Sequence, residues 1–315
     1  MKNNLIKGSI LVGLGSASYG MLATFVKMSY KEGFTTAEVT ISQFTIGVIG
    51  LLLISMFSKL FSKEQATNAA ASASSVAATA GSKPTSNWKS LLKLMFAGTA
   101  MGLTSMFYYL SVQYIPVSVG IVLLMQTVWM GVILEMFLHK KRPGNRKIIS
   151  VLIIIGGTIL ATNLLQSSVT LDWRGVGFGM LAALAYTITV YASNGIALHL
   201  PVIRRSLYLV IGGLIIIMLI FHASLNMDFS FDIFWRWGIV LALFGTILPP
   251  LLFTMGMPLT GVGLGTIIAA VEIPVSVLMA HFILKEPVNL MQFGGIVLIL
   301  FAVVLMNIEK PKRAA

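Results

Sequence analysis

The sequence predicts an all-α integral membrane protein whose ten transmembrane helices form two inverted five-helix repeats. Three observations support this prediction. Of the 315 residues, 57% are hydrophobic and only 10% are charged, whereas a soluble domain carries about 25% charged residues. The apolar residues also form blocks along the whole chain, and about 20 such residues cross a hydrocarbon core of roughly 30 Å. Finally, features of the first half recur in the second half.

Apolar runs predict ten spans in order along the chain. They cover residues 8–26, 39–58, 94–114, 117–138, 148–165, 175–198, 206–223, 237–257, 261–284 and 288–308. The divisions at Pro116 and around Pro258 are the weakest, but each pair of spans would otherwise form one helix of about 45 residues, too long for a single crossing. The first run has no small-residue cleavage site, so we expect a retained helix rather than a secretory signal.

The net charge of +12 has an explanation in membrane topology. If both termini are cytoplasmic, 17 of the 22 Lys and Arg residues lie inside and five lie outside. The positive-inside rule requires this bias, and the opposite orientation would reverse it. We therefore expect a multi-pass protein of the cell (inner) membrane with cytoplasmic termini, in contact with lipid and without a nucleic-acid partner.

Residues 65–87 are rich in Ala, Ser and Thr and lack the bulky apolar residues of a span. This composition predicts a flexible cytoplasmic linker, with a regulatory or phosphorylated loop as the alternative.

Two halves of the chain repeat. Residues of span one recur in span six at an offset of 167, and residues after span four recur after span nine at an offset of 144. The matched pairs are Gly8 and Gly175, Leu14 and Leu181, Tyr19 and Tyr186, Lys141 and Lys285, and Pro143 and Pro287. The offsets differ by 23, the length of the 65–87 linker. The predicted repeats are 1–145 with helix 148–165, and 168–315. Since each has five helices, the copies lie in opposite orientations, and this inverted-repeat topology is used for alternating access.

Glu272 is the only acidic or basic residue deep inside a predicted span. An ionisable group there costs several kcal/mol, so a functional role is the default hypothesis. Glu272 could carry a proton or pair with a cationic substrate. The alternative is a protonated Glu that only fixes helix packing.

Proline and glycine residues near Glu272 indicate deformable helices. Pro274 removes a backbone hydrogen bond close to Glu272, and Gly265 lies about two turns earlier. Pro249 and Pro250 should kink or break span eight. These four residues are candidate gating hinges, and packing around a bend is the alternative for each.

Polar and aromatic residues gather in spans one, three, four and six, which favours a shared cavity over isolated packing contacts. The candidates for substrate binding or proton coupling, besides Glu272, are Tyr19, Tyr108, Tyr109, Gln126, Trp129, Tyr186 and Asn194. We expect the cavity to be lined by spans one, three, four, six, eight and nine, with spans five and ten at the periphery.

The segment Glu272-Ile273-Pro274-Val275, followed by Lys285-Glu286-Pro287 and Gly294-Gly295, resembles the ten-helix EamA-type branch of the drug/metabolite transporter superfamily. Residues 175–186 are similar to the start of each repeat in that family. The resemblance covers nearly the whole chain, and it implies a transporter of small metabolites or drug-like solutes.

A secondary transporter, exporting or exchanging a small-molecule substrate by alternating access and open to proton coupling, explains these features best. A membrane-embedded enzyme and a channel or facilitator are the alternatives. The sequence lacks HExxH, Gly-x-Ser-x-Gly and Walker A motifs, and it has no Cys, so no enzyme activity and no cofactor are expected. The four His residues are scattered, so no metal is expected either. The sequence leaves the oligomeric state open, with a monomer among the alternatives.

Overall fold

A computed structural model describes residues 2–70, 88–140, 144–162, 172–197, 200–226, 229–260 and 268–307. Within these ranges every regular element is a helix. The helices of the first half are α1 (Lys2–Lys31), α2 (Thr36–Ala70), α3 (Trp88–Tyr114), α4 (Val117–Leu124), α5 (Thr127–His139) and α6 (Asn145–Ala161). Those of the second half are α7 (Trp173–Gly195), α8 (Val202–Ile220), η1 (His222–Asn226), η2 (Phe234–Gly238), α9 (Ile239–Ala242), η3 (Leu243–Ile247), α10 (Leu248–Thr260), α12 (Glu272–Leu284) and α13 (Leu290–Asn307).

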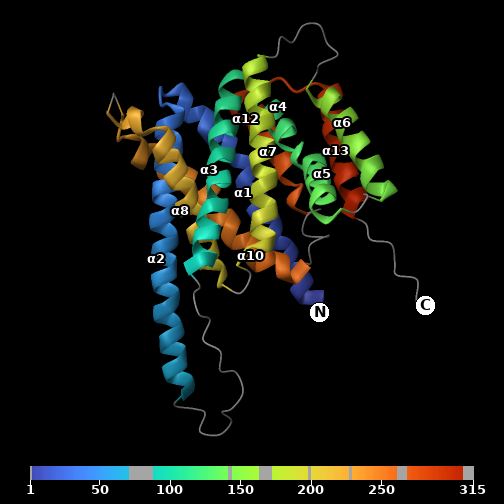
Figure 1. Cartoon of the computed structure of the whole chain (residues 1–315). Coiled ribbons are helices and arrows are strands. Elements are labelled where there is room, and N and C mark those ends of the chain that lie inside the picture. Colours follow the sequence, from blue (N-terminus) through green and yellow to red (C-terminus); the bar gives the residue numbers. More distant parts are fainter. Residues whose placement is uncertain are drawn as a thin grey trace, which may run out of the picture.

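These helices make the ten predicted crossings, which confirms the fold class. Six described helical segments are long and apolar enough to span a membrane on their own, and two shorter apolar helices, Glu272–Leu284 and Leu290–Leu305, accompany them. α1 begins and α13 ends at the same end of the bundle, here called the N-terminal end (Figure 1). The opposite end, where α1 turns into α2, is called the α1–α2 end.

Two predicted boundaries differ from the observed helices. α2 continues to Ala70, so residues 65–70 are helical rather than part of a flexible linker. Gln and three Ala residues in this stretch are good helix formers, which explains the extension. The rest of the proposed linker, 71–87, lies outside the described residues. Span four is broken at Met125 and Gln126 into α4 and α5. The first part of predicted span nine, 261–267, also lies outside the described residues.

Span eight departs from α-helical geometry just before its proline pair. The π-helical turns η2 and η3 precede α10, whose first residues are Leu248, Pro249 and Pro250. A proline has no N–H to donate, so it is tolerated in the first turn of a helix but not in the interior. The predicted disruption of span eight is therefore present, as a π-helical segment that ends where the prolines begin.

Equivalent contacts in the two halves support the inverted repeat. α1 packs on α10 and α12, and its counterpart α7 packs on α3, α4 and α5. A Cβ added to Gly8 would lie 3.0 Å from the Gly256 carbonyl oxygen, and one added to Gly175 would lie 3.2 Å from the Ser111 oxygen. Gly8 and Gly175 are 167 residues apart, and Ser111 and Gly256 are 145 apart. The same close helix crossing therefore occurs twice, in opposite orientations.

The structure corrects the second predicted offset from 144 to 145. α5 and α12 each contain 13 residues, and their first residues are 145 positions apart. The first residues of α6 and α13 are also 145 positions apart. Each helix of the first pair ends at a lysine in the left-handed conformation, Lys140 (φ 49°) and Lys285 (φ 61°). Lys140, not Lys141, is thus the counterpart of Lys285. The two offsets, 167 and 145, then differ by 22 rather than 23.

The packing divides the central helices into two groups. The α1 group consists of α1, α10 and α12, and the α7 group consists of α3, α4 and α7. α4 and α12 bring the groups together, whereas α6 and α13 form a separate pair at the edge. In that pair a Cβ on Gly157 would lie 2.9 Å from the Gly295 oxygen, so small residues allow close contact.

Candidate functional site

Glu272 is the first residue of α12 and lies where α12 touches α1. Gly20 of α1 faces it so closely that an added Cβ would be 2.6 Å from the Glu272 carbonyl oxygen. The Glu272 side chain is only half-buried. Its carboxyl group forms no hydrogen bond or ion pair with any residue that the structure describes. Because no described residue hydrogen-bonds to it, the Glu272 carboxyl group is a candidate to bind a ligand or a proton.

Three tyrosines from three other helices surround this carboxyl group. Tyr19 of α1, Tyr108 of α3 and Tyr186 of α7 each lie close enough for their hydroxyl groups to interact electrostatically with Glu272. Tyr19 also packs on Phe253 of α10, with ring centroids 5.9 Å apart. The α1 group and the α7 group therefore both contribute side chains to one polar centre.

Buried hydroxyl groups near Glu272 lack hydrogen-bond partners. The oxygens of Thr24, Tyr108 and Ser276 are buried, and none of them is bonded to another described residue. Tyr108 and Ser276 lie near each other, but their hydroxyls do not reach hydrogen-bond geometry. An unsatisfied buried polar group costs about 1–3 kcal/mol. Such groups are expected where water or a ligand completes the hydrogen bonding. We refer to Glu272, Tyr19, Tyr108, Tyr186 and Ser276 as the Glu272 cluster.

Gln126 and Trp129 do not join the Glu272 cluster. The Gln126 amide nitrogen donates to the Thr158 hydroxyl of α6 at 2.7 Å, and the Trp129 indole N–H donates to the Gln126 oxygen at 2.8 Å. Gln126 also donates to the Val122 carbonyl oxygen at 3.0 Å. These bonds connect the broken span four to the peripheral helix α6. The structure therefore places both residues in a helix-to-helix contact.

Tyr109 also faces away from Glu272. Its hydroxyl donates a short hydrogen bond to the Gln43 side-chain oxygen of α2, and both residues are almost fully buried. The hydroxyl of Tyr30 donates to the Tyr109 carbonyl oxygen at 3.2 Å. Gln43 is a further polar residue of this contact, and a lone amide near the start of apolar span two was a usable signal for it.

The proposed hinge residues have different positions. Pro274 is the third residue of α12, so it lies in the first turn of a helix, and the Ala270 carbonyl accepts the N–H of Ile273 at 3.1 Å. The Ala270 carbonyl oxygen, which Pro274 cannot bond because it has no N–H, is thus satisfied by Ile273, since the helix starts at Glu272 instead of passing through it. Gly265 lies outside the described residues. Asn194 belongs to α7, but its side chain is not among those described.

The first repeat has a hydrogen bond where the second repeat has Glu272. At an offset of 145 the counterpart of Glu272 is Thr127, and at an offset of 167 the counterpart of Gly20 is Thr187. The Thr127 and Thr187 hydroxyls are 2.8 Å apart, so one donates to the other. In the first repeat a hydrogen bond between Thr127 and Thr187 joins the two helices at this position. In the second repeat the equivalent position holds the Glu272 carboxyl group, which has no partner among the described residues.

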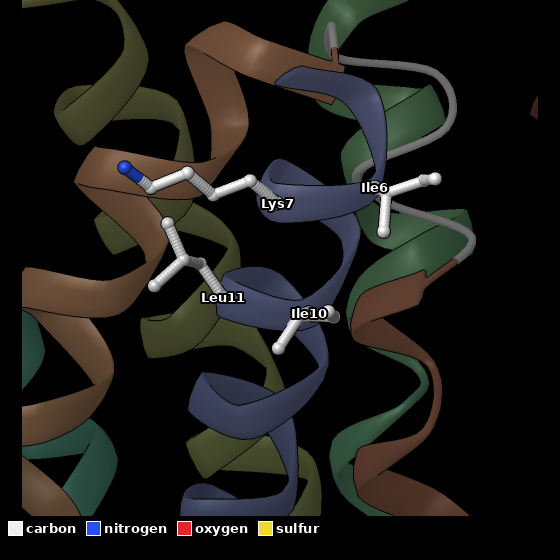
Figure 2. A pocket seen from close by; sticks show the side chains of 4 residues that line it. All are labelled: Ile6, Lys7, Ile10 and Leu11. Carbon is white, nitrogen blue, oxygen red and sulfur yellow. The ribbon is translucent and has the colours of Figure 1, made fainter. Parts of the chain in front are cut away.

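A surface hollow lies elsewhere, at the N-terminal end of α1. Figure 2 shows its lining residues Ile6, Lys7, Ile10 and Leu11. It lies about two helical turns before Tyr19. Three of the four lining side chains are apolar, and Ile6 and Ile10 are more than half exposed. This composition suits a surface in contact with lipid better than a polar solute site.

The fold is that of a multi-pass integral membrane protein built from an inverted repeat. The sequence matches the model of the EamA-like transporter family over residues 6–163 and again over 173–308. The chain therefore belongs to this family of the drug/metabolite transporter superfamily, and it is a membrane transporter. No curated protein matches the sequence.

Solved structures share the fold. One of them, described as "Crystal structure of protein", superimposes with a TM-score of 0.63 at 14% identity, and the match covers 94% of this chain and 95% of that chain. Among the residues that the structure describes, no group of three or more His, Asp or Glu side chains could hold a metal ion.

Proposed function

We propose that this chain is a secondary transporter that exports or exchanges a small metabolite or drug-like solute by alternating access, and that the solute and a proton bind at the Glu272 cluster. The observation that carries this proposal is the carboxyl group of Glu272. It lies at the junction of the α1 and α7 groups and has no hydrogen-bond or ion-pair partner among the described residues.

The surroundings of Glu272 favour neutral or cationic solutes. The cluster offers one carboxyl group and several hydroxyl oxygens, all of which can accept hydrogen bonds. Two ion pairs of the described residues, Lys27 with Glu286 and Arg236 with Glu32, involve other carboxylates than Glu272. An anion would therefore meet a carboxylate without a compensating positive charge. Tyrosine rings can also contact the apolar part of an amphiphilic solute.

The proposed transport cycle depends on the orientation of the protein in the membrane and on the boundaries of its repeats. The distribution of Lys and Arg supports a cell (inner) membrane protein with cytoplasmic termini. The α1–α2 end then faces outward. The two repeats act as the moving units, with boundaries near 1–145 together with helix 148–165, and 168–315. A single chain contains both repeats, so a monomer is sufficient for the cycle.

The test is transport by the purified protein in liposomes, screened over amines, amino acids, nucleobases and amphiphilic cations with and without a pH gradient. The decisive variant is Glu272→Gln, since Gln keeps the shape and hydrogen-bonding capacity of a protonated Glu but cannot release a proton. We expect this variant to fold, to lose the response of uptake to the pH gradient, and to lose most or all uptake.

Glu32→Gln is the matched control. Glu32 accepts a hydrogen bond from Trp237 at 3.0 Å at the exposed α1–α2 end, away from Glu272, so uptake should keep its pH dependence. Equal pH profiles in Glu272→Gln and the parent protein would remove Glu272 from the mechanism. Non-saturable flux down a gradient, with no counter-transport, would favour a channel or facilitator. Chemical conversion of the solute would favour a membrane enzyme.

A further inference from the structure

A largely buried ion pair lies at the α1–α2 end, and neither of its members belongs to the Glu272 cluster. Lys27 of α1 and Glu286, in the loop between α12 and α13, approach to 3.3 Å between Nζ and Oε1. Their side chains are 25% and 10% exposed. Lys285 precedes Glu286 and has a left-handed backbone (φ 61°), which ends α12 and turns the chain toward α4.

The Glu286 carboxylate also caps the start of α4. Oε1 accepts the Val117 backbone N–H at 2.8 Å, and Oε2 accepts the N–H and the hydroxyl of Ser118 at 3.1 and 3.0 Å. The residue before the helix, Pro116, provides no side-chain hydrogen bond. The first N–H groups of a helix have no partner within the helix, and they favour a negative charge. Glu286 therefore supplies from another part of the chain the cap that α4 lacks.

The contacts of this ion pair cross between the two helix groups. Lys27 donates to the Ile115 carbonyl oxygen at 3.0 Å, and Ile115 lies in the turn between α3 and α4. Glu286 binds Val117 and Ser118, the first two residues of α4. Lys27 belongs to the α1 group, and Glu286 directly follows α12 of that group. Separation of the α1 group from the α7 group at this end must therefore break four hydrogen bonds, all of them to charged side chains.

The sequence does not provide the lysine and the carboxylate of this pair at the repeat-related positions. The repeat offsets relate Lys27 to Asn194 and Glu286 to Lys141. An amide and a lysine replace the lysine and the carboxylate, so no negative charge is available at the second position. The two ends of the inverted repeat thus differ in chemistry although they are equivalent in fold.

We propose that Lys27, Glu286 and the start of α4 form an ionic latch that holds the transporter closed at the α1–α2 end and sets the resting balance between its two access states. The latch rests on the alternating access of the proposed function. Glu286 does not bind the solute and acts by positioning α4 against α12. Charged hydrogen bonds are stronger than neutral ones by an amount that corresponds to about a tenfold change in an equilibrium.

The test measures the distance between the two helix groups in the full-length protein. The chain has no cysteine, so spin labels attach only at introduced residues. Trp173 of α7 and Phe282 of α12 are 78% and 64% exposed and make no latch contact. The double variant Trp173→Cys, Phe282→Cys is the parent. Its distance distribution in lipid, by pulsed electron paramagnetic resonance, should be dominated by one short distance.

Adding Glu286→Gln should raise the ratio of long to short distances by about tenfold. The matched control, Glu32→Gln, removes an exposed carboxylate at the same end, 3.6 Å from Arg236, and should leave the distribution unchanged. If Glu286→Gln does not fold, Lys27→Met is read in the same way, since Met keeps the length of the side chain without its charge.

An unchanged distribution in the latch variant, or an equal shift in the Glu32→Gln control, would overturn the latch. The proposed function has a separate readout in the uptake assay. If uptake still depends on Glu272 while the spin-label distances are the same with and without Glu286→Gln, the latch is refuted and the proposed function is not.

Discussion

Gly20→Ala tests whether the contact between α1 and α12 positions the Glu272 cluster. The added Cβ would lie 2.6 Å from the Glu272 carbonyl oxygen, 3.0 Å from the Val275 Cβ and 3.1 Å from the Ser276 nitrogen. Ordinary contacts begin at 3.4 Å, so α1 and α12 must separate by about 0.8 Å at this point. The atoms that obstruct the methyl group are mostly backbone, and they cannot move without displacing the helix.

We expect Gly20→Ala to destabilise the protein by about 1–3 kcal/mol, the usual cost of overpacking. It should also weaken solute binding, because the displaced α12 carries Glu272 and Ser276. The assay is thermal unfolding of the purified protein in detergent, together with KM for uptake in liposomes. Both readouts come from the same preparation.

Gly13→Ala is the matched control on the same helix. Its added Cβ would be 3.7 Å from the Ile268 side chain, an ordinary contact. Replacing Gly by Ala inside a helix gains up to about 1 kcal/mol, so this variant should be as stable as the parent or more stable. Equal melting temperatures and equal KM values for the two variants would refute the argument that Gly20 sets the spacing.

Three further predictions concern other parts of the fold. Gln126→Leu removes the hydrogen bonds to Thr158 and Trp129, so it should lower the free energy of unfolding by about 1–3 kcal/mol without raising KM. A raised KM would indicate that Gln126 contacts the solute. Gly212→Ala should destabilise strongly, because its Cβ would collide with the Met95 carbonyl oxygen, whereas a Cβ at Gly177 would meet open space. Equal melting temperatures of the two variants would contradict the packing of α3 on α8. In intact cells an impermeant thiol reagent should label Leu290→Cys but not Trp88→Cys, which are 91% and 67% exposed at opposite ends; the reverse pattern would invert the proposed orientation.

Hydropathy was sufficient to predict the number and order of the spans, because burial in a bilayer imposes a length that soluble folds do not. It could not predict the break at Met125 and Gln126, where both residues are compatible with a continuous helix. Nor could it detect that residues 65–70 extend α2. Local composition there suggested a linker, but Ala-rich sequence also continues a helix that has already formed.

The candidate site was predictable only in part. An unpaired Glu272 beside Tyr19, Tyr108 and Tyr186 agrees with the sequence argument, since a charge in an apolar span is conspicuous. Helical periodicity could not tell which neighbour each polar face meets, so Gln126 and Trp129 were assigned to the site although they bond to each other and to α6.

Glu286 shows a different reason for a missed residue. In sequence it is one of two charged residues in a short loop, and such residues are usually solvated. Its partners are the backbone N–H groups of Val117 and Ser118, about 170 residues earlier in the chain. Every residue except proline has a backbone N–H group, so the amino-acid sequence does not show which of them bind a carboxylate. The contact could be found only from the fold.

The difference between Glu272 and its counterpart Thr127 limits the concentration gradient that the proposed proton coupling can sustain. A hydroxyl group does not titrate in the physiological range, so in the proposed mechanism the two repeats provide one proton-exchanging group, Glu272, instead of two. With one proton per cycle, a neutral solute can be concentrated at most about tenfold for each pH unit across the membrane, before the contribution of the membrane potential. A singly charged cation exchanged for that proton would move no net charge, and its accumulation would be insensitive to voltage.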